Sequence, residues 1–349
     1  MSMPAARWAG LTVGLLLCCV YTMHSVARGA TGATFLASFG HLAGITPPKQ
    51  EIHQGRRLRM GVHGGDKSKK EDFREEEAIH IVYVMCGDER SDEFMASLKS
   101  LHLFAKAALN EDLNYYHIHV ITADTDGTEE VGGLQPRSNF RLTFHKMVMD
   151  APELFGPCAM QTLYIHESAE FNNIDQVIYL DLDTLWLDDP RELWSHFHAI
   201  NARGAFFGAV EEAREGGWYA GNKPGEDLPY YGQGSGSSGV GLNSGVMMIS
   251  LARLRAQNFS AERDVIEQRW GRKHLRLGPQ DVLNAYGAEH PERIYELPCI
   301  FNFRIGAGCD SNTGMPVILH GNGRLKDDVT IVKGNSYRHI FDVMSSLRG

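Results

Sequence analysis

Apolar runs alternate with helix-like patterns along the chain from residue 78 onward. Strands are predicted at Ala78–Cys86, Tyr115–Ala123 and Phe140–Val148, where apolar residues are concentrated or alternate with polar ones. A fourth run, Val177–Leu180, is apolar and mostly β-favouring, as in a buried central strand. Between the first two strands, apolar residues at helical spacing predict a helix over Ser91–Leu109. Strands that alternate with helices indicate an α/β fold with a mostly parallel sheet.

The second half of the chain continues this alternation. Further helices are predicted over Met160–Phe171, Pro190–Phe197, Ala261–Trp270 and directly after Gly278, and further strands over Ala205–Ala213, Asn243–Ile249 and Val317–His320. Residues Arg214–Gly241 are dense in Gly, Ser, Tyr and Pro, which predicts a long irregular segment. A loop of this length within a compact domain is usually functional or disordered.

The N-terminal region has a different pattern. An apolar run from Trp8 to Met23 has the length that separates a spanning helix from the apolar part of a signal peptide. We predict a cytoplasmic tail (1–7), a transmembrane signal anchor (8–26), a flexible lumenal stem (27–77) and one catalytic domain (78–349). Cleavage among the small residues Ala27–Ala30 is the alternative. An anchor would place the body of the protein in the lumen of the Golgi or endoplasmic reticulum as a single-pass type II protein.

Charge is unevenly distributed between these regions. The chain has 34 Lys and Arg against 43 Asp and Glu, a formal net charge of −9. The first 70 residues are basic, so the body is more acidic than this total indicates. An acidic body argues against a nucleic-acid partner and is compatible with a site that recruits cations.

Cysteine usage agrees with an oxidising compartment. Of the six cysteines, Cys18 and Cys19 lie in the apolar run. The others are Cys86, Cys158, Cys299 and Cys309, for which three pairings are possible. Cys299 and Cys309 bracket a short loop, which favours that pair. A glycosylation sequon at Asn258 is consistent with a lumenal surface.

Two acids follow the central strand directly. Asp181 and Asp183 are two residues apart, and such side chains point to the same side of a strand. Two unpaired carboxylates in one place are costly, and a divalent cation with a phosphate behind it would pair them. A D-x-D that only ends a strand and starts a turn is the alternative. In open α/β sheets, ligands lie beyond the carboxyl ends of the strands, where these acids are expected.

Other polar residues lie at predicted element ends. Asn243 and Ser244 open a strand and suit hydroxyl recognition, or form a turn. Asp281 opens a helix and is also a candidate helix cap. His320 ends a strand before a Gly-rich turn, which makes it a candidate third metal ligand, and Lys326 could reach a diphosphate. Neither a G-x-G-x-x-G nor a P-loop motif supports dinucleotide or Walker-type binding.

Together these motifs resemble family 8 of the glycosyltransferases. The matching motifs, in order and spacing, are D-L-D at Asp181–Asp183, N-S-G at Asn243–Gly245, Q-D at Gln280–Asp281 and L-H-G at Leu319–Gly321. The resemblance is closer to the glucoside xylosyltransferases, carried also by Cys86–Arg90, Phe155–Ala159, Gly217–Tyr219, Pro229–Gly232, Pro298–Arg304 and Ile318–Asn322. The resemblance implies a GT-A fold, with a Rossmann-like, mostly parallel central sheet flanked by helices in a single catalytic domain.

The resemblance also implies an activity. Members of this group are retaining, metal-dependent enzymes of the Golgi or endoplasmic reticulum membrane. They transfer xylose from UDP-xylose in α linkage to O-linked glucose on EGF-like repeats, with Notch as the prominent acceptor. Family 8 enzymes that use UDP-glucose or UDP-galactose are an alternative. A haloacid-dehalogenase-type phosphatase is disfavoured because no G-D-x-x-x-D pattern follows the D-L-D motif.

Site roles follow from the resemblance residue by residue. Asp181, Asp183 and His320 would bind Mn²⁺ (or Mg²⁺). Donor binding would involve Met85, Cys86, Gly87, Leu182, Asn243, Ser244, Gly321 and Lys326, the first three at the uridine and the last two at the phosphates. Gln280 and Asp281 would be the catalytic residues, with Gln280 near the reacting carbon of the donor.

Three departures from the pattern of the xylosyltransferase group stand out. Pro279 replaces an acid before Gln280. Gln161 and Thr162 stand where many members have an Arg that usually helps to bind the donor. A Gly/Ser insert at Ser235–Gly239 lengthens a loop expected on the acceptor side. These departures leave a second alternative, a lumenal protein that binds sugar nucleotides but turns them over weakly.

Overall fold

The computed structural model of the protein describes part of the chain. The described residues are 75, 78–86, 90–106, 115–122, 139–147, 158–212, 228–233, 240–304, 314–322, 330–332 and 335–347. The chain divides into two units, Met1–Glu71 and Asp72–Gly349, and all described residues belong to the second. The predicted tail and anchor therefore lie outside the described residues, as does the stem apart from Glu75. No helix in the described ranges is long and apolar enough to cross a membrane.

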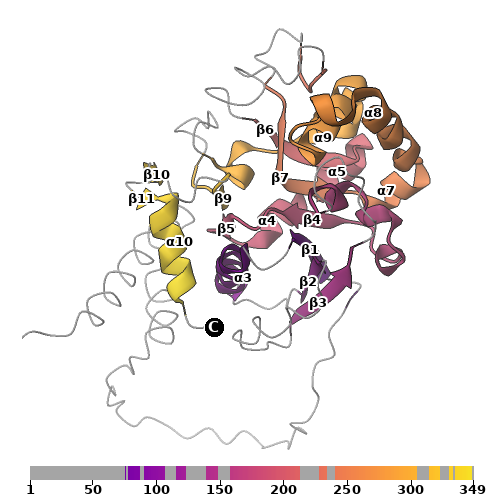
Figure 1. The fold of residues 1–349 in the computed structure, drawn as a ribbon. Helices are drawn as coiled ribbons and strands as arrows, with labels where there is room; N and C mark the ends of the chain where they lie inside the picture. Colours follow the sequence, from indigo (N-terminus) through magenta and orange to yellow (C-terminus); the bar gives the residue numbers. More distant parts are fainter. Residues whose placement is uncertain are drawn as a thin grey trace, which may run out of the picture. The chain divides into compact units, whose positions relative to one another are not determined.

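A seven-stranded sheet forms the centre of this unit (Figure 1), with strand order β3-β2-β1-β4-β7-β6-β8. Its strands are β1 (Ala78–Met85), β2 (Tyr115–Thr122), β3 (Phe140–Lys146), β4 (Val177–Leu180), β6 (Phe207–Glu211), β7 (Leu242–Ile249) and β8 (Ile294–Glu296). Strand β1 pairs in parallel with β2 and β4, β2 with β3, and β6 with β8. Only β7 runs antiparallel to its neighbours β4 and β6. The prediction of a mostly parallel sheet is confirmed.

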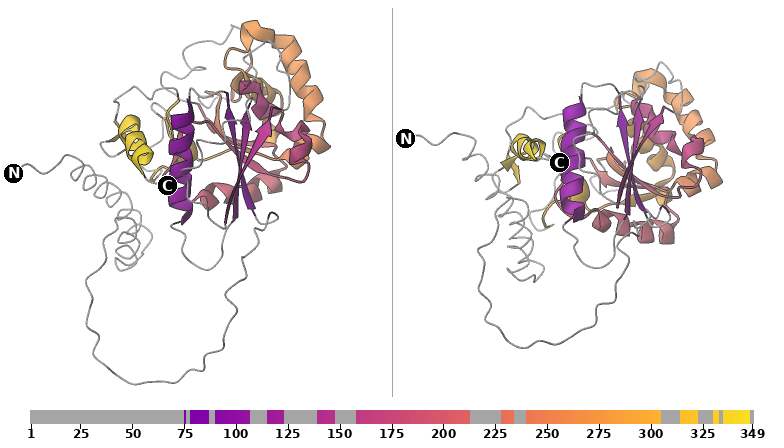
Figure 2. Two further views of the ribbon diagram at one scale, coloured as in Figure 1. Left: turned by 60° about the horizontal axis from the view of Figure 1, so that its bottom comes forward. Right: turned by 90° about the horizontal axis from the view of Figure 1, so that it is seen from below.

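Both faces of the sheet are covered, as Figure 2 shows. Every residue of β1, β2 and β4 is buried, which fits central strands covered on both sides. Alternate residues of β1 enter different cores. Ile81 and Tyr83 pack with Phe94 of α3 (Ser91–Lys106), whereas Val82 and Val84 face the core that contains Phe171.

The remaining elements surround this sheet. The helices are α4 (Pro190–Ser195), α5 (Phe197–Arg203), α7 (Leu251–Ala256), α8 (Phe259–His274), α9 (Pro279–Glu289) and α10 (Tyr337–Ser346), with 3-10 helices η5 (Ala159–Leu163), η6 (Ile165–Glu167), η7 (Ala169–Phe171), η8 (Pro291–Arg293) and η9 (Cys299–Asn302). Two small sheets pair β5 (Thr184–Trp186) with β9 (Ile318–His320), and β10 (Thr330–Val332) with β11 (Asn335–Ser336). Helix α10 lies beside α3, where Lys99 Nζ donates to the carbonyl of Ser345 at 2.8 Å.

One predicted element is wrong in type. The single helix predicted over residues 160–171 is instead the three short 3-10 helices η5, η6 and η7. Ser168 has an extended backbone, and its hydroxyl accepts a hydrogen bond from the N–H of Glu170. A serine that bonds a nearby backbone group in this way competes with helix formation. Tertiary packing of Leu163, Ile165 and Phe171 into one core maintains the tighter turns.

Candidate active site

Strand direction brings distant residues to one edge of the sheet. Strands β1 and β4 run in parallel, so Cys86 and Asp181 follow their carboxyl ends on the same side. Because β7 is antiparallel to β4, its first residues, including Asn243, also lie there. The N–H of Asp181 donates to the carbonyl of Gly245 at 2.8 Å. Strand β6 ends at this edge too, immediately before Glu212.

The D-L-D motif forms a turn and does not continue the strand. Strand β4 ends at Leu180, and Thr184 closes the turn with two bonds to the carbonyl of Asp181, from its N–H at 3.3 Å and its Oγ1 at 2.8 Å. The prediction that strand pleating places both carboxylates on one side is therefore wrong, because the two aspartates belong to a turn that follows the strand. Leu182 at the centre of the turn is buried in the core that contains α3. A donor contact of Leu182 stays a prediction.

Three predicted metal ligands converge at this turn. One ligand atom each from Asp181, Asp183 and His320 lies within 4.8 Å of the other two. His320 Nε2 is 3.5 Å from Asp181 Oδ2 and 3.4 Å from Asp183 Oδ1. Strand β9 brings His320 there by pairing with β5, which starts directly after the turn. Two carboxylates and one imidazole form a donor set that suits a divalent cation such as Mn²⁺.

Burial and charge act in opposite directions on His320. Burial alone lowers its pKa, but the carboxylates of Asp183 and Asp181 outweigh this effect and raise the pKa to about 9. The two carboxylates therefore favour a positive charge beside them, on the imidazole or on a bound cation. The side chain of Asp181 remains 35 % exposed whereas Asp183 and His320 are buried, so the cluster opens toward solvent on the Asp181 side.

A line of buried amides orients His320 from behind. Its Nδ1 lies 2.9 Å from Asn302 Oδ1, Asn302 Nδ2 donates to Asn243 Oδ1 at 2.8 Å, and Asn243 Nδ2 donates to Glu212 Oε2 at 2.9 Å. We call Glu212, Asn243 and Asn302 the amide chain. A carboxylate only accepts, so each amide has one allowed orientation, and the chain ends on an acceptor for His320 Nδ1–H. The lone pair of a neutral His320 is thereby placed on Nε2, which faces the two aspartates.

Glu212 also orients the predicted catalytic amide. Gln280 Nε2 donates to Glu212 Oε2 at 3.1 Å, and Gln280 Oε1 accepts from the N–H of Ser244 at 3.1 Å. Glu212 is only 4 % exposed, and its other oxygen is paired with buried Arg304 at 3.2 Å. The buried carboxylate is thus compensated by hydrogen bonds and a cation, as such groups require.

Sequence reasoning did not assign roles to Glu212, Asn302 or Arg304. The signal for Glu212 is its position at the end of a predicted strand, the same signal that identified Asp181. Asn302 and Arg304 lie within a segment that carries the family resemblance, but nothing local indicates that they face the site.

Two glycines allow close approach of site residues. A Cβ on Gly245 would lie 2.1 Å from Cε1 of His320, so the third residue of the N-S-G motif leaves room for the ring. A Cβ on Gly321 would lie 2.9 Å from the ring of Tyr337. The N–H of Gly321 and the hydroxyl of Tyr337 both donate to the carbonyl of Asp183 at 2.8 Å. These bonds fix the turn, and the role of Gly321 toward phosphate stays a prediction.

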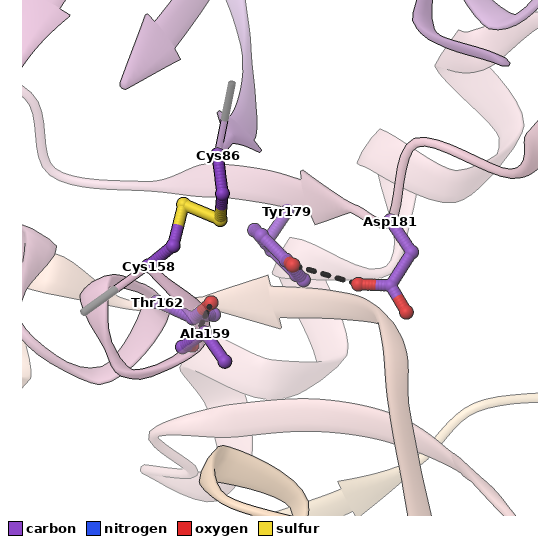
Figure 3. Close-up of a disulfide and its surroundings, with 6 residues drawn as sticks. All are labelled: Cys86, Cys158, Ala159, Thr162, Tyr179 and Asp181. Atoms are coloured by element: carbon purple, nitrogen blue, oxygen red, sulfur yellow. Dashed lines mark hydrogen bonds between the residues drawn. A yellow bond between two sulfur atoms is a disulfide. The ribbon is translucent and has the colours of Figure 1, made fainter. Parts of the chain in front are cut away.

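A disulfide borders the site, as Figure 3 shows. Cys86 after β1 is bonded to Cys158 before η5, with a Cα–Cα distance of 5.6 Å. Cys299 is disulfide-bonded as well, and its predicted partner, Cys309, lies outside the described residues. The sequence left three pairings of the four cysteines open, and the structure establishes the Cys86–Cys158 bond. Because Cys86 is bonded to Cys158, any contact with uridine would occur beside the disulfide.

Thr162, at the position where many members of the xylosyltransferase group have an Arg, lies near this disulfide. Thr162 is buried, and its Oγ1 donates to the carbonyl of Ala159 at 3.2 Å (Figure 3). Tyr179 lies on β4, which pairs with β1, and its hydroxyl donates to Asp181 Oδ1 at 2.7 Å. Burial, followed by the charge of Asp181, raises the pKa of Tyr179, which therefore remains a hydrogen-bond donor.

Other predicted site residues have structural contacts. Asp281 is fully buried, and its Oδ2 accepts from the N–H of Leu277 at 2.7 Å in the turn before α9. This bond supports the alternative in which Asp281 stabilises the helix start, and its catalytic role stays a prediction. Met85 is buried in the core beside α3. Gly87 and Lys326 lie outside the described residues.

A cation of the protein itself approaches the cluster. Arg90 Nη2 is 3.3 Å from Asp183 Oδ2, and Arg90 Nε also bonds to Glu93. The Arg90 side chain is 46 % exposed. It provides a positive charge beside Asp183.

Family comparison agrees with this geometry. The sequence model of glycosyl transferase family 8 matches residues 96–326, more than half of the chain. The chain belongs to glycosyl transferase family 8. The matched region contains all three residues of the Asp181, Asp183 and His320 cluster, together with the amide chain and Gln280. The family predicted from the motifs is confirmed.

Several curated relatives of the chain are glucoside xylosyltransferases. The chain is 29 % identical to glucoside xylosyltransferase 1 of Rattus norvegicus and 28 % identical to that of Homo sapiens. These matches cover 78 % and 77 % of this chain but only 63 % and 62 % of the relatives. The chain thus spans less than two thirds of their length. A glycosyltransferase-like protein LARGE of Caenorhabditis elegans is 26 % identical over 80 % of this chain and 44 % of its own.

Solved structures of glycosyltransferases share the fold. Mouse xyloside xylosyltransferase 1, in its apo form, superposes with a TM-score of 0.54 at 19 % identity, covering 71 % of this chain and 98 % of its own. The galactosyltransferase LgtC, solved with donor and acceptor sugar analogs, has a TM-score of 0.51 at 17 % identity, covering 78 % and 97 %. This likeness confirms the GT-A fold expected for family 8.

Proposed function

We propose that the protein is a metal-dependent, retaining xylosyltransferase. It would transfer xylose from UDP-xylose in α linkage to O-linked glucose on EGF-like repeats. The observation that carries the proposal is the convergence of Asp181, Asp183 and His320 at the carboxyl edge of a GT-A sheet. The similarity to glucoside xylosyltransferases supports xylose as the donor sugar and a glucoside as the acceptor.

The metal ligands fit a cation that binds a nucleotide diphosphate. Asp181, Asp183 and His320 would hold Mn²⁺ or Mg²⁺, which when bound would neutralise charge that develops on the UDP leaving group. Asn302 keeps His320 in the tautomer that binding requires. Arg90 adds positive charge beside Asp183.

The residues near the expected sugar position favour same-face attack by the acceptor. The amide of Gln280 is a poor nucleophile, and both ends of it are hydrogen-bonded, to Glu212 and to the N–H of Ser244. Glu212 is buried beneath the amides, and both of its oxygens have partners. A group held this way orients the donor sugar as it passes through an oxocarbenium-like state, but it is poorly placed to attack that sugar.

Donor specificity has a second candidate. The galactosyltransferase LgtC shares the fold, so UDP-galactose or UDP-glucose fits the same scaffold as an alternative donor. A weakly catalytic protein that binds sugar nucleotides is the other candidate, since Thr162 and Pro279 replace residues of the group's pattern. Pro279 occupies the first turn of α9, where proline is well tolerated. Loss of an acid there leaves the helix start intact.

We also propose a lumenal location, with the protein held in the Golgi or endoplasmic reticulum membrane by the predicted anchor. The Cys86–Cys158 disulfide and the bonded Cys299 support an oxidising compartment. Asn258, the sequon residue, is exposed in the turn between α7 and α8, which is accessible to a glycan. O-glucosylated EGF-like repeats would meet the protein in that compartment.

UDP release tests the proposal directly. The full-length chain is supplied with Mn²⁺ and with UDP-xylose, UDP-glucose or UDP-galactose, with and without a β-glucoside acceptor. We expect acceptor-stimulated release from UDP-xylose, its loss on adding a chelator, and its restoration by Mn²⁺. Asp181→Asn is the matched variant, and it should abolish transfer because an amide is a weaker ligand than a carboxylate.

Each other outcome identifies a different function. Preference for UDP-galactose or UDP-glucose would overturn the xylose assignment but retain the enzyme class. No turnover with any donor, together with retained UDP binding, would favour the binding protein. Full activity in Asp181→Asn would overturn the metal assignment.

A further inference from the structure

Histidines gather at the opposite end of the strands from the candidate active site. His80 of β1 lies beside His117 of β2 in the sheet, and His119 follows on the same face. The exposed fractions of the three residues are 8 %, 7 % and 1 %. His80 is five residues before the end of β1, about 16 Å from the active-site edge at the usual rise per residue. We call His80, His117 and His119 the histidine cluster.

We propose that the histidine cluster, with Glu75, is a second metal site, which binds a transition-metal cation such as Zn²⁺. One nitrogen atom from each of the three imidazoles lies within 4.8 Å of the other two. His80 Nδ1 is 3.1 Å from His119 Nε2, close to the ~3.3 Å that separates two ligands of one tetrahedral zinc ion. Imidazole nitrogen selects zinc, copper or nickel, whereas the oxygen-rich set of Asp181 and Asp183 suits Mn²⁺ or Mg²⁺.

Hydrogen bonds behind the histidine cluster place lone pairs toward its centre. His145 Nδ1–H donates to the carboxylate of Glu170, which leaves His145 Nε2 able to accept from His119 Nδ1–H, at 2.9 Å. The lone pair of His119 is then on Nε2, facing His80. A carboxylate and histidine behind a ligand histidine is a common outer-shell arrangement at zinc sites.

Hydrogen bonds at both ring nitrogens orient His117. Its Nε2 lies 2.8 Å from Thr143 Oγ1 of β3, and its Nδ1 donates to the carboxylate of Glu75 when no cation is bound. A cation at Nδ1 would require the ring hydrogen to be on Nε2 instead, where Thr143 Oγ1 can accept a hydrogen bond from it. Glu75 Oε1 adjoins this Nδ1 and is 3.9 Å from His80 Nδ1, so a carboxylate lies where a fourth ligand is needed. The other oxygen of Glu75 bonds to Arg141 at 2.6 Å. Three imidazoles and one carboxylate complete a tetrahedral set.

Electrostatics favour a neutral, metal-ready histidine cluster. Burial lowers the pKa of His80 to about 4, because desolvation outweighs the attraction of Glu75. Burial likewise lowers the pKa of His117 and of His119. Neutral imidazole is the form that binds a cation, so these directions agree with the geometry of a metal site. The rings of His117 and His119 lie 3.8 Å apart, so the cation would bind beside the rings and not between them.

Such a site would join the first two strands and the segment that precedes them. Its ligands come from β1, β2 and Glu75, and its outer-shell partner Thr143 comes from β3. Cation binding would therefore stabilise one edge of the sheet without touching the reaction. The competing arrangement is a metal-free ladder, in which His80 Nδ1–H donates to His119 Nε2.

Cobalt titration separates the two arrangements. The full-length Asp181→Asn protein, in which the candidate active-site cluster is disabled, is freed of metal with a chelator and titrated with Co²⁺. We expect about one equivalent to produce the intense visible bands of tetrahedral nitrogen-rich cobalt. Zn²⁺ should abolish these bands and raise the melting temperature. Absence of tetrahedral bands in this folded protein would overturn the proposal, since a hydrogen-bonded ladder binds no cation.

Variants locate the site. His119→Gln in the same background should lose the bands, whereas His102→Gln, a buried histidine of α3 outside the histidine cluster, should keep them. Thr143→Val preserves a β-favouring side chain and removes only the outer-shell bond to His117, so Zn²⁺ affinity should fall by about 10- to 100-fold. Unchanged bands in His119→Gln would overturn the assignment. If that variant fails to fold, the Thr143→Val titration decides, and unchanged affinity there would also overturn it.

Discussion

The chemistry of individual side chains at the candidate site depends on what lies behind them. Asp181, Asp183 and His320 are candidate metal ligands, and the tautomer of His320 depends on Asn302 and, through Asn243, on Glu212. Outer-shell partners of this kind commonly change metal affinity by about 10- to 100-fold.

Asn302→Ala tests this dependence. The change removes the acceptor for His320 Nδ1–H and leaves a buried polar atom without that partner, so the Mn²⁺ concentration for half-maximal activity should rise by about 10- to 100-fold. Activity at saturating Mn²⁺ should fall much less. Asn201→Ala, on the exposed side of α5, is the control and should change neither value. A normal Mn²⁺ requirement in Asn302→Ala would show that the amide chain does not support the ligand.

Gly245→Ala tests the packing of the same histidine. The added Cβ would collide with the His320 ring, so the ring must move and the metal site is lost. We expect loss of Mn²⁺-dependent transfer, by more than about 100-fold, while circular dichroism shows a folded protein. The magnitude corresponds to at least ~2.7 kcal/mol of transition-state stabilisation. Wild-type activity in Gly245→Ala would mean that His320 can occupy another position without cost.

Secondary elements converge on the site because of direction and covalent linkage. Strand β7 runs against its neighbours, which brings Asn243 and Ser244 to the edge where β4 ends. The short helix η5 is attached to the end of β1 by the Cys86–Cys158 disulfide. Asn284 of α9 bonds to both the N–H and the carbonyl of Leu242, which holds the helix that carries Gln280 against β7.

Removing the disulfide tests its contribution. A sequence separation of 72 residues predicts that Cys86→Ser with Cys158→Ser lowers the free energy of unfolding by about 2–4 kcal/mol. Denaturant unfolding measures this change. Because η5 lies beside Tyr179, which bonds to Asp181, we also expect a higher KM for the UDP-sugar. The control is the unmodified protein with its disulfides intact, and equal stability of that protein and the double variant would contradict the prediction.

The unit as a whole should respond to ligands at its sheet edge. Ligands that bind only the folded state stabilise it, by about 2.7 kcal/mol at 100 times the dissociation constant. UDP with Mn²⁺ should therefore raise the melting temperature, and UDP with a chelator should raise it much less. For Asp183→Asn, each mixture should raise the melting temperature no more than UDP with a chelator raises that of the wild type. Equal shifts with and without Mn²⁺ in the wild type would contradict a metal-bridged nucleotide.

Local sequence patterns predicted most of the fold. Strands β1, β2, β3, β4 and β7 and helices α3 and α9 lie where apolar periodicity places them, because burial of one or both faces imposes that periodicity. The failure at residues 160–171 is equally physical. An apolar spacing close to three residues fits a 3-10 turn as well as an α-helix, and the extended backbone at Ser168, where the hydroxyl caps η7, interrupts a continuous helix.

The sequence was sufficient to predict that Asp181, Asp183 and His320 lie together, because each stands in a short motif at the end of a predicted strand. It left open which cysteines pair and how the two aspartates meet. Only the tertiary structure brought Glu212, Asn302 and Arg304 behind His320, and only it gathered the histidine cluster on one face. The reason is that hydrogen bonds between residues 18 to 92 positions apart depend on strand order and direction, which packing of the complete sheet determines.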